Sequence, residues 1–303
     1  SASELPALDE LERRGRANGL EGLRRLEAAE ISELEPAVVG VSGLLVPETG
    51  IVDFPAVNRA YAEDVGAHGG EVRLGARVRG IVEDGPEVVV ETSLGEVRAR
   101  RAVNCAGLQA DRLAHACGAA TDLRIVPFRG DYYYLRPERS GLVSRPIYPV
   151  PDPAFPFLGV HLTTKLGGRI EAGPNAVLAL DREGYTKTAF RWADAASALG
   201  YPGFWRLAAR YWRTGLAELR RSFSKESFAR SLRTLVPSVR TEDLSAGGCG
   251  VRAQAMNRDG TLVDDFRIVP HGRTLHVLNT PSPAATASLA IGDHVAALVL
   301  GES

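Results

Sequence analysis

The side chains best suited to chemistry in this sequence are two basic residues inside apolar or glycine-rich segments. Arg252 follows the run GCGV, where a guanidinium can grip a carboxylate in a bidentate pair. His161, inside FPFLGVHLTTK, has the residue type of a general base that works near neutral pH. The alternatives are an arginine paired structurally with Asp264 or Asp265, and a hydrogen-bonded core histidine. We predict Arg252 and His161 as the catalytic residues.

Further polar side chains occur in the strand-rich region between residues 124 and 169, surrounded by apolar residues. Polar groups inside otherwise apolar strands are candidates to contact a substrate. The predicted substrate-binding residues, in addition to Arg252, are Arg129, Tyr148, Thr163 and Lys165.

The stretch VNCAGLQADRLAHACG, residues 103–118, is typical of a buried strand, a glycine turn and a helix. In open α/β sheets, ligands bind outside the carboxyl ends of strands, where Asn104 and Gly107 fall. Gly107 lets the backbone approach a ligand closely, and Asp111 follows it in the predicted helix. Tight packing of the helix on the strand is the alternative explanation.

A second strand-to-helix corner is NTPSPAATASLAIG, residues 279–292. Free backbone N–H groups and the positive end of a helix dipole suit a phosphate or an anionic ring. Ser282 is the predicted cap and Pro283 takes the first turn, while the small residues Ala284 and Ala285 would let a flat ligand lie against the helix. A well-capped core helix explains the pattern equally.

The composition excludes several classes of protein. Basic and acidic residues number 36 and 37, so the net charge of −1 gives no general attraction to nucleic acid or to an anionic membrane. Three cysteines without a C-x-x-C pair favour a reducing cytosol over a disulfide framework. The sequence contains no zinc-type spacing, no G-x-S-x-G motif and no run of ~18 apolar residues. We expect a cytoplasmic protein without a metal site.

Hydrophobic periodicity divides the chain into alternating segments. Predicted helices lie within 5–29 (two of them), 53–68, 110–117 and 186–235, and a further helix follows residue 281. Predicted strands lie within 43–54 (two of them), 71–82, a hairpin in 87–103, 124–169 and 275–280. Because a large β-plus-helix insertion splits strands of one type, we predict a mixed α/β fold. A nucleotide-binding layer would be interleaved with an antiparallel substrate sheet.

Taken in order, these pieces resemble the FAD-dependent oxidoreductases of the D-amino-acid-oxidase superfamily. The similarity is greatest to their L-2-hydroxyglutarate dehydrogenase/oxidase branch. The resemblance runs from Glu4 to Gly292, and IYPVPDPAFPFLGVHLTT together with NTPSPAATASLAIG are its most specific stretches. The other stretches that carry it are ELPALDELERRGRANGL, LVPETGIVDF, VNCAGLQADRLA, PFRGDYYYL, GPNAVLALDREGY and RAQAMNRDGTLVDDF.

The resemblance implies FAD as cofactor and gives the two corners their roles. The first would border the dinucleotide, the second would approach the flavin ring and pyrophosphate, and Val78 would hold the adenine moiety through backbone groups. The cofactor-binding residues so implied are Val78, Asn104, Ala106, Gly107, Asp111, Ser282, Pro283, Ala284, Ala285 and Thr286. Arg252 falls where the superfamily binds the substrate carboxylate, although this chain has RAQ where many relatives have R-P.

The implied domains are discontinuous. Residues 52–122 and 246–303 would form an FAD-binding, Rossmann-like layer, and residues 1–51 and 123–245 the substrate-binding domain. The implied reaction is oxidation of L-2-hydroxyglutarate, a dicarboxylate, to 2-oxoglutarate by hydride transfer to flavin. Alternatives are a superfamily oxidoreductase for an amino acid, amine or glycerol phosphate, and a non-catalytic fragment.

Members of the superfamily begin with a strand–G-x-G-x-x-G–helix unit, which this sequence does not contain. Ser1 would fall inside the family pattern, after that unit. We therefore expect weakened FAD binding, or none. The electron acceptor would be oxygen, a quinone or a carrier flavoprotein, and peripheral association with the inner membrane would be compatible with the absence of a membrane-spanning segment.

Overall fold

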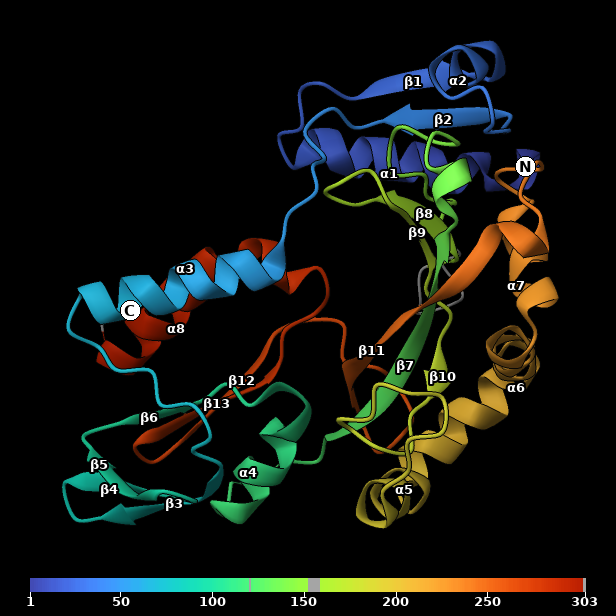
Figure 1. Cartoon of the computed structure of the whole chain (residues 1–303). Helices are drawn as coiled ribbons and strands as arrows, with labels where there is room; N and C mark the ends of the chain where they lie inside the picture. The colour runs from blue at the N-terminus through green and yellow to red at the C-terminus, as the bar shows by residue number, and fades with distance from the viewer. Residues whose placement is uncertain (120, 152–158, 302–303) are drawn as a thin grey trace.

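The computed structural model describes residues 1–119, 121–151 and 159–301, and it shows a large antiparallel sheet beside a smaller layer of short sheets and helices (Figure 1). The predicted mixed α/β fold is therefore confirmed.

The large sheet is built on the long strand β7 (Arg124–Leu135). On one side β7 pairs antiparallel with β11 (Leu244–Met256). On its other side it pairs with β10 (Val177–Leu178) and β9 (Ile170–Gly173), and β9 in turn pairs with β8 (His161–Thr164). The aromatic and apolar run of β7 suits this central position, because strands buried on both faces need no polar alternation.

A bulge in β11, within residues 246–249, sets the register of the central pair. Gly247 is required there, since a Cβ atom would lie only 2.5 Å from the carbonyl oxygen of Tyr132. Beyond the bulge the two strands pair without interruption and place Arg252 opposite Phe128. The bulge thus decides which β11 side chains share a face with which β7 side chains.

Helices and a small two-stranded sheet cover the large sheet. They are α1 (Leu5–Ala17), β1 (Arg24–Glu27), α2 (Ala28–Leu34), β2 (Ser42–Leu45), α5 (Trp192–Leu199), α6 (Pro202–Phe223) and α7 (Lys225–Leu232). The largest core cluster joins α7 to β7, β8 and β9, and its Phe228, Leu232, Leu162 and Ile170 are fully buried. Burial of each such side chain contributes about 1.5–3 kcal/mol.

The smaller layer contains the one parallel strand pair among the described residues. Strand β13 (Thr274–Asn279) pairs parallel with β6 (Ala102–Asn104) and antiparallel with β12 (Arg267–His271). A separate three-stranded sheet comprises β3 (Val78–Asp84), β4 (Glu87–Thr92) and β5 (Gly95–Ala99).

Three helices complete this layer: α3 (Phe54–Ala67), α4 (Ala110–Ala116) and α8 (Ser288–Leu300). Helix α4 packs through Ala110 and Ala114, which are fully buried, whereas α3 has no buried residue. Helices α3 and α8 lie side by side (Figure 1), and the hydroxyls of Tyr61 and Ser288 are 3.2 Å apart.

Several predicted elements agree with the structure. Helix α3 follows the predicted cap Asp53, whose carboxylate accepts from the Ala56 N–H. The hairpin predicted in 87–103 is β4–β5, and α4 ends before Gly118, whose φ is +79°.

Other predictions were wrong in extent. Strand β3 starts only at Val78, after a turn in which Gly75 has a φ of +73°. The segment 43–54 contains one strand, β2, rather than two, and strand β1 was not foreseen. The final helix begins at Ser288 instead of Pro283, because a tight turn precedes it, in which the Thr286 hydroxyl donates to the Pro283 carbonyl.

The predicted division into domains stays a prediction. The structure adds that the proposed boundary at residue 246 falls inside β11, a strand of the large sheet up to Met256. Part of IYPVPDPAFPFLGVHLTT, residues 152–158, lies outside the described residues.

Candidate functional site: a polar sheet face and a neighbouring cleft

One face of the large sheet gathers most of the predicted catalytic and substrate-binding residues. Residues that pair across two strands have their side chains on the same face of the sheet, and so do residues two apart along one strand. Arg252 pairs with Phe128, so it lies on the same face as Phe128 and Tyr132. Through Tyr134 and Glu171 the same face continues to Thr163 and His161. The Arg252 guanidinium acts on the Tyr132 hydroxyl and lowers its pKa, against the larger raising effect of burial. We call this surface the polar sheet face.

His161 has a defined tautomer in this setting. Its Nδ1 lies 3.0 Å from the carbonyl oxygen of Gly159. Since a carbonyl only accepts, Nδ1 carries the proton and Nε2 carries the lone pair. Burial lowers the pKa of His161, and the positive charge of Arg252 lowers it further. The neutral ring, which is the form that a general base needs, therefore persists at neutral pH.

Tyr148 and Lys165 border the polar sheet face. The Tyr148 ring lies 4.5 Å from the His161 ring, between centroids. Lys165 Nζ is 3.1 Å from a Glu171 carboxylate oxygen, in a half-exposed ion pair. The structure thus brings His161, Arg252, Thr163, Tyr148 and Lys165 into one region, as predicted, although contact with a substrate stays a prediction.

Sequence reasoning missed Tyr132 and Glu171 on this face. Burial raises the pKa of Tyr132, so its hydroxyl keeps its proton at neutral pH. The alternation within DYYYLRP was the available signal, because it separates Tyr132 and Tyr134 from Arg129 and Tyr133.

Arg129 does not join the polar sheet face. It lies on the opposite side of β7, is 6% exposed, and its Nε donates to Asp131 at 2.7 Å. The carbonyls of Thr186 and Lys187 accept further bonds from its guanidinium. This placement argues against the predicted substrate contact, and we assign Arg129 a structural role.

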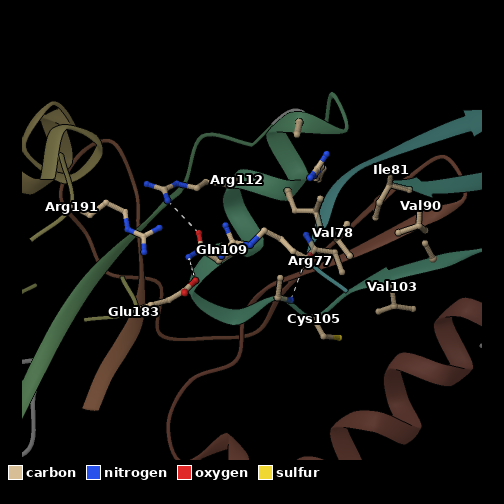
Figure 2. A pocket seen from close by; sticks show the side chains of 16 residues that line it. Arg77, Val78, Ile81, Val90, Val103, Cys105, Gln109, Arg112, Glu183 and Arg191 are labelled. Atoms are coloured by element: carbon tan, nitrogen blue, oxygen red, sulfur yellow. Dashed lines mark hydrogen bonds between the residues drawn. The ribbon is translucent and has the colours of Figure 1, made fainter. Parts of the chain in front are cut away.

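A cleft of about 660 Å³ opens between β3 and the strand-to-helix corner after β6 (Figure 2). Figure 2 shows apolar side chains at one end, among them Val78, Ile81 and Val103, and charged side chains at the other. The polar groups labelled at the charged end are Gln109, Arg112, Glu183 and Arg191. Gln109 links two of them, because its side chain donates to Glu183 and accepts from Arg112.

Three residues of the predicted cofactor set line this cleft: Val78, Asn104 and Ala106. Gly107 does not line it, but its φ of +51° makes the turn into the helix possible. Arg112 and Arg191 were not singled out from the sequence, since nothing local distinguishes them from the many other arginines.

Asp111 was also predicted to bind cofactor, and its placement argues against this. Its carboxylate is 2% exposed, accepts from the Ile125 N–H, and forms an ion pair of 2.5 Å with the buried Arg182. Arg182 also donates to the carbonyls of Leu108 and Ile125. Asp111 therefore stabilises the corner through the protein interior and does not line the cleft.

The second corner, residues 282–286, follows the carboxyl end of β13. Because β6 and β13 are parallel, both corners leave the sheet at the same edge, which is where cofactors bind in such folds. Ser282, Pro283, Ala285 and Thr286 are exposed and Ala284 is half-buried. Contact of these residues with a cofactor stays a prediction.

The described residues contain no group of three or more histidine, cysteine or acidic side chains placed to hold a metal ion. Nor do they contain a helix of the length and apolarity that crossing a membrane requires.

Known proteins share both the sequence and the fold. Residues 1–298 match the family described as FAD dependent oxidoreductase. The L-2-hydroxyglutarate dehydrogenase of Indibacter alkaliphilus is 47% identical over 96% of this chain and 73% of its own length. That of Escherichia coli K12 is 42% identical over 98% of this chain and 70% of its own length.

Among solved structures, the L-alpha-glycerophosphate oxidase from Mycoplasma pneumoniae with FAD bound superposes with a TM-score of 0.75. It is 20% identical and covers 99% of this chain and 70% of its own. That likeness shows the fold alone, whereas the family match and the relatives extend over nearly the whole sequence. This chain belongs to the family of FAD-dependent oxidoreductases.

Proposed function

We propose that this protein oxidises L-2-hydroxyglutarate to 2-oxoglutarate with FAD. The observation that carries the proposal is the juxtaposition of Arg252, a carboxylate-binding cation, with the neutral base His161 on one sheet face. The relatives of 42–47% identity that bear this enzyme's name supply the identity of the substrate.

The cleft fits the nucleotide end of FAD. Val78, Ile81 and Val103 offer an apolar slot for an adenine ring, with the β3 backbone at its edge. Arg112 and Arg191 lie at the charged end, where phosphates need cations. Arg112 is also paired with the buried Asp194 at 2.7 Å and Arg191 with Asp181 at 3.6 Å, so a phosphate would share these cations. The corner at Asn104–Gly107 brings backbone close to the same space.

Bound FAD supplies the acceptor for the hydride that leaves C2 of the substrate. Arg252 holds the carboxylate next to C2 and fixes the orientation of the C2–H bond. Nε2 of His161 accepts the hydroxyl proton while the C–O bond gains its double-bond character, so proton and hydride leave separately. The protonated Tyr132 keeps the Arg252 guanidinium in place.

The second carboxylate of the substrate requires its own donors. Lys165, Thr163 and Tyr148 are the groups of the polar sheet face beyond His161, and they supply one cation and two hydroxyls. Lys165 is already paired with Glu171, so we expect it to contribute less than Arg252 does.

The test is the visible spectrum of the purified chain with FAD, recorded anaerobically before and after L-2-hydroxyglutarate. We expect a retained flavin that bleaches with this substrate and not with D-2-hydroxyglutarate, glycine or glycerol 3-phosphate. Bleaching by glycine or glycerol 3-phosphate instead would reject the substrate, and failure to retain FAD would reject the cofactor cleft.

We further propose that the protein docks peripherally on anionic membranes through α6, which would bring it to a quinone acceptor. The helix lies at the outer edge of the molecule (Figure 1) and carries large apolar side chains that are 46–72% exposed. They are Trp205, Trp212, Leu216, Leu219 and Phe223.

The charges of α6 favour a lipid surface over a second copy of the chain. Its basic residues are Arg206, Arg210, Arg213, Arg220 and Arg221. Its one acidic residue, Glu218, is buried and accepts from Arg221. Aromatic residues beside a cationic stripe are typical of helices that lie in a membrane interface, whereas two such stripes repel each other.

Cosedimentation tests this with vesicles of equal parts phosphatidylglycerol and phosphatidylcholine, and with pure phosphatidylcholine. We expect binding to the first, loss of binding in the variant Trp212→Ser/Leu216→Ser, and no loss in Leu94→Ser, an exposed leucine of the β4–β5 turn. A stable dimer that needs Trp212 and ignores vesicles would contradict the proposal.

A further inference from the structure

Two buried side chains, Asn104 and His276, connect the parallel strands under the corner that borders the cleft. His276 is fully buried on β13 and lies in register with Asn104 on β6. The Asn104 amide Nδ2 donates to the Ala110 carbonyl at 2.9 Å, and its Oδ1 accepts from the Ala106 N–H at 3.1 Å. Its Nδ2 is also 3.0 Å from Nδ1 of His276. These bonds join a strand, the corner and the start of α4.

The two backbone bonds decide how the amide is oriented. Turning it by half a rotation would set Nδ2 against the Ala106 N–H and Oδ1 against the Ala110 carbonyl, which are two repulsive contacts. The NH₂ group of Asn104 must therefore face His276. A nitrogen that faces a donor at hydrogen-bond distance has to accept, so Nδ1 of His276 carries a lone pair and the proton lies on Nε2.

The surroundings of His276 also favour the neutral ring. Nε2 is buried and has no hydrogen-bond partner in the described part of the chain. The titratable groups on the packed elements are His271 on β12, with ring centroids 6.3 Å apart, and Asp111 and His115 on α4. Asp111 is already paired with Arg182, and α8 packs on the other face of β13. Burial lowers the pKa of His276, and His271 lowers it further.

We propose that His276 is a positioning residue: as a neutral acceptor it holds the Asn104 amide, and through it the backbone corner from Ala106 to Ala110. A proton on Nδ1 would place two donors 3.0 Å apart, so the ring and the corner cannot both keep their arrangement after protonation. Only the consequence for cofactor affinity rests on the proposed function, because the tautomer and the corner belong to the chain alone.

Ring-nitrogen NMR of the ¹⁵N-histidine-labelled chain tests the tautomer directly. We expect one histidine whose Nδ1 is unprotonated and whose Nε2 is protonated, unchanged on acidification through pH 6.5, the ordinary pKa of histidine. That signal should disappear in His276→Asn. A proton on Nδ1 of His276, or titration at the ordinary value, would overturn the proposal.

Hydrogen exchange of the Ala106 amide tests the effect on the corner. His276→Asn keeps an acceptor at about the place of Nδ1, whereas His276→Gln moves it toward the place of Nε2. We expect exchange near the wild-type rate in the Asn variant and about tenfold faster in the Gln variant, with β7 amides unchanged in both, as loss of one buried hydrogen bond predicts. Equal rates in the two variants would refute the assignment.

Acidification gives a second measurement that needs no folded Gln variant. Ala106 exchange in the wild-type chain, corrected for intrinsic pH dependence, should rise once His276 takes up a proton, and the Asn variant should show no such rise. A rise of the same size in both would attribute it to another group. Titration with FAD at each pH then shows whether cofactor affinity follows the corner, and its failure alone would count against the proposed function.

Discussion

The two faces of the large sheet place the same residue type in opposite situations. On one face Arg129 is buried and bonded to Asp131 and to two backbone carbonyls. On the other, Arg252 is half-buried and contacts Tyr132, an uncharged partner. The nearest partner of the Arg129 guanidinium is a carboxylate, whereas the Tyr132 hydroxyl beside Arg252 carries no charge. We propose that Arg129 is structural and that Arg252 binds the substrate.

The largest effect should come from breaking the buried pair. Arg129→Met leaves the Asp131 carboxylate buried without its cation, and we expect the free energy of unfolding to fall by about 3–5 kcal/mol. Denaturant titration measures this. The double variant Arg129→Met/Asp131→Asn should recover part of the loss, because no charge is then left unpaired. An unchanged midpoint for Arg129→Met would remove the contrast between the two faces.

Arg252→Met should have the converse effect. We expect kcat/KM for L-2-hydroxyglutarate to fall by about 30-fold or more, as loss of a carboxylate partner worth about 2–5 kcal/mol predicts. The denaturation midpoint should move less than in Arg129→Met, since Arg252 is half-buried and Arg129 is buried in its pair with Asp131. Arg252→Lys is the matched control, because lysine keeps the positive charge but cannot form the bidentate pair of hydrogen bonds with a carboxylate. Full activity in Arg252→Met would exclude it from the site.

The pH dependence should sharpen the link between Arg252 and His161. In the proposed mechanism the neutral ring of His161 is the base. Burial and the Arg252 charge lower the pKa of His161, so kcat/KM should decline only below pH 6.5. In Arg252→Met the acid limb should move to higher pH, because the positive charge no longer disfavours the imidazolium. The free energy of unfolding should change in the same direction as kcat/KM. It should decrease as pH falls from 6.5, the ordinary pKa of histidine, toward the lowered pKa of His161. If the acid limb of the kcat/KM profile does not move in Arg252→Met, a group other than His161 causes that limb.

The smallest effect should come from the rim of the polar sheet face. Lys165→Met removes a half-exposed ion pair with Glu171, and we expect KM to rise by about tenfold or less with kcat unchanged. Steady-state kinetics separate the two parameters. A large fall in kcat would instead place Lys165 beside the reacting atoms.

The sequence correctly predicted those elements that depend on residues close to one another in the chain. The Asp53 cap, the β4–β5 hairpin and the strand–glycine–helix corner each depend on residues within a few positions of one another, and each is present. Strand β1 escaped prediction because its pairing with β2 comes from elsewhere in the chain. The start of α8 was misplaced because the Pro283 carbonyl closes a turn first.

The sequence could predict the site only from the chemistry of its residue types and from the alternation of side chains along strands. Asp111 has the chemistry of a binding residue, but its partner Arg182 lies 71 positions away in the sequence. Arg129 has Asp131 two positions away, but the Thr186 and Lys187 carbonyls that also accept from it lie 57 and 58 positions away. Such pairings become visible only once the chain is folded. Tyr132 escaped for a related reason, because the register between β7 and β11 decides that it meets Arg252.

The buried Arg182 has a mechanical consequence for the reaction. Its guanidinium donates to the carbonyl of Leu108 at the corner beside the cleft, to Asp111 in α4 and to the carbonyl of Ile125 near the start of β7. Ile125 pairs with Ala255, three residues along β11 from Arg252. One side chain thus links the corner beside the cleft to the strand that carries Arg252. Under the proposed function, this link would help to hold the reacting atoms at the separation of about 3–3.5 Å that hydride transfer needs.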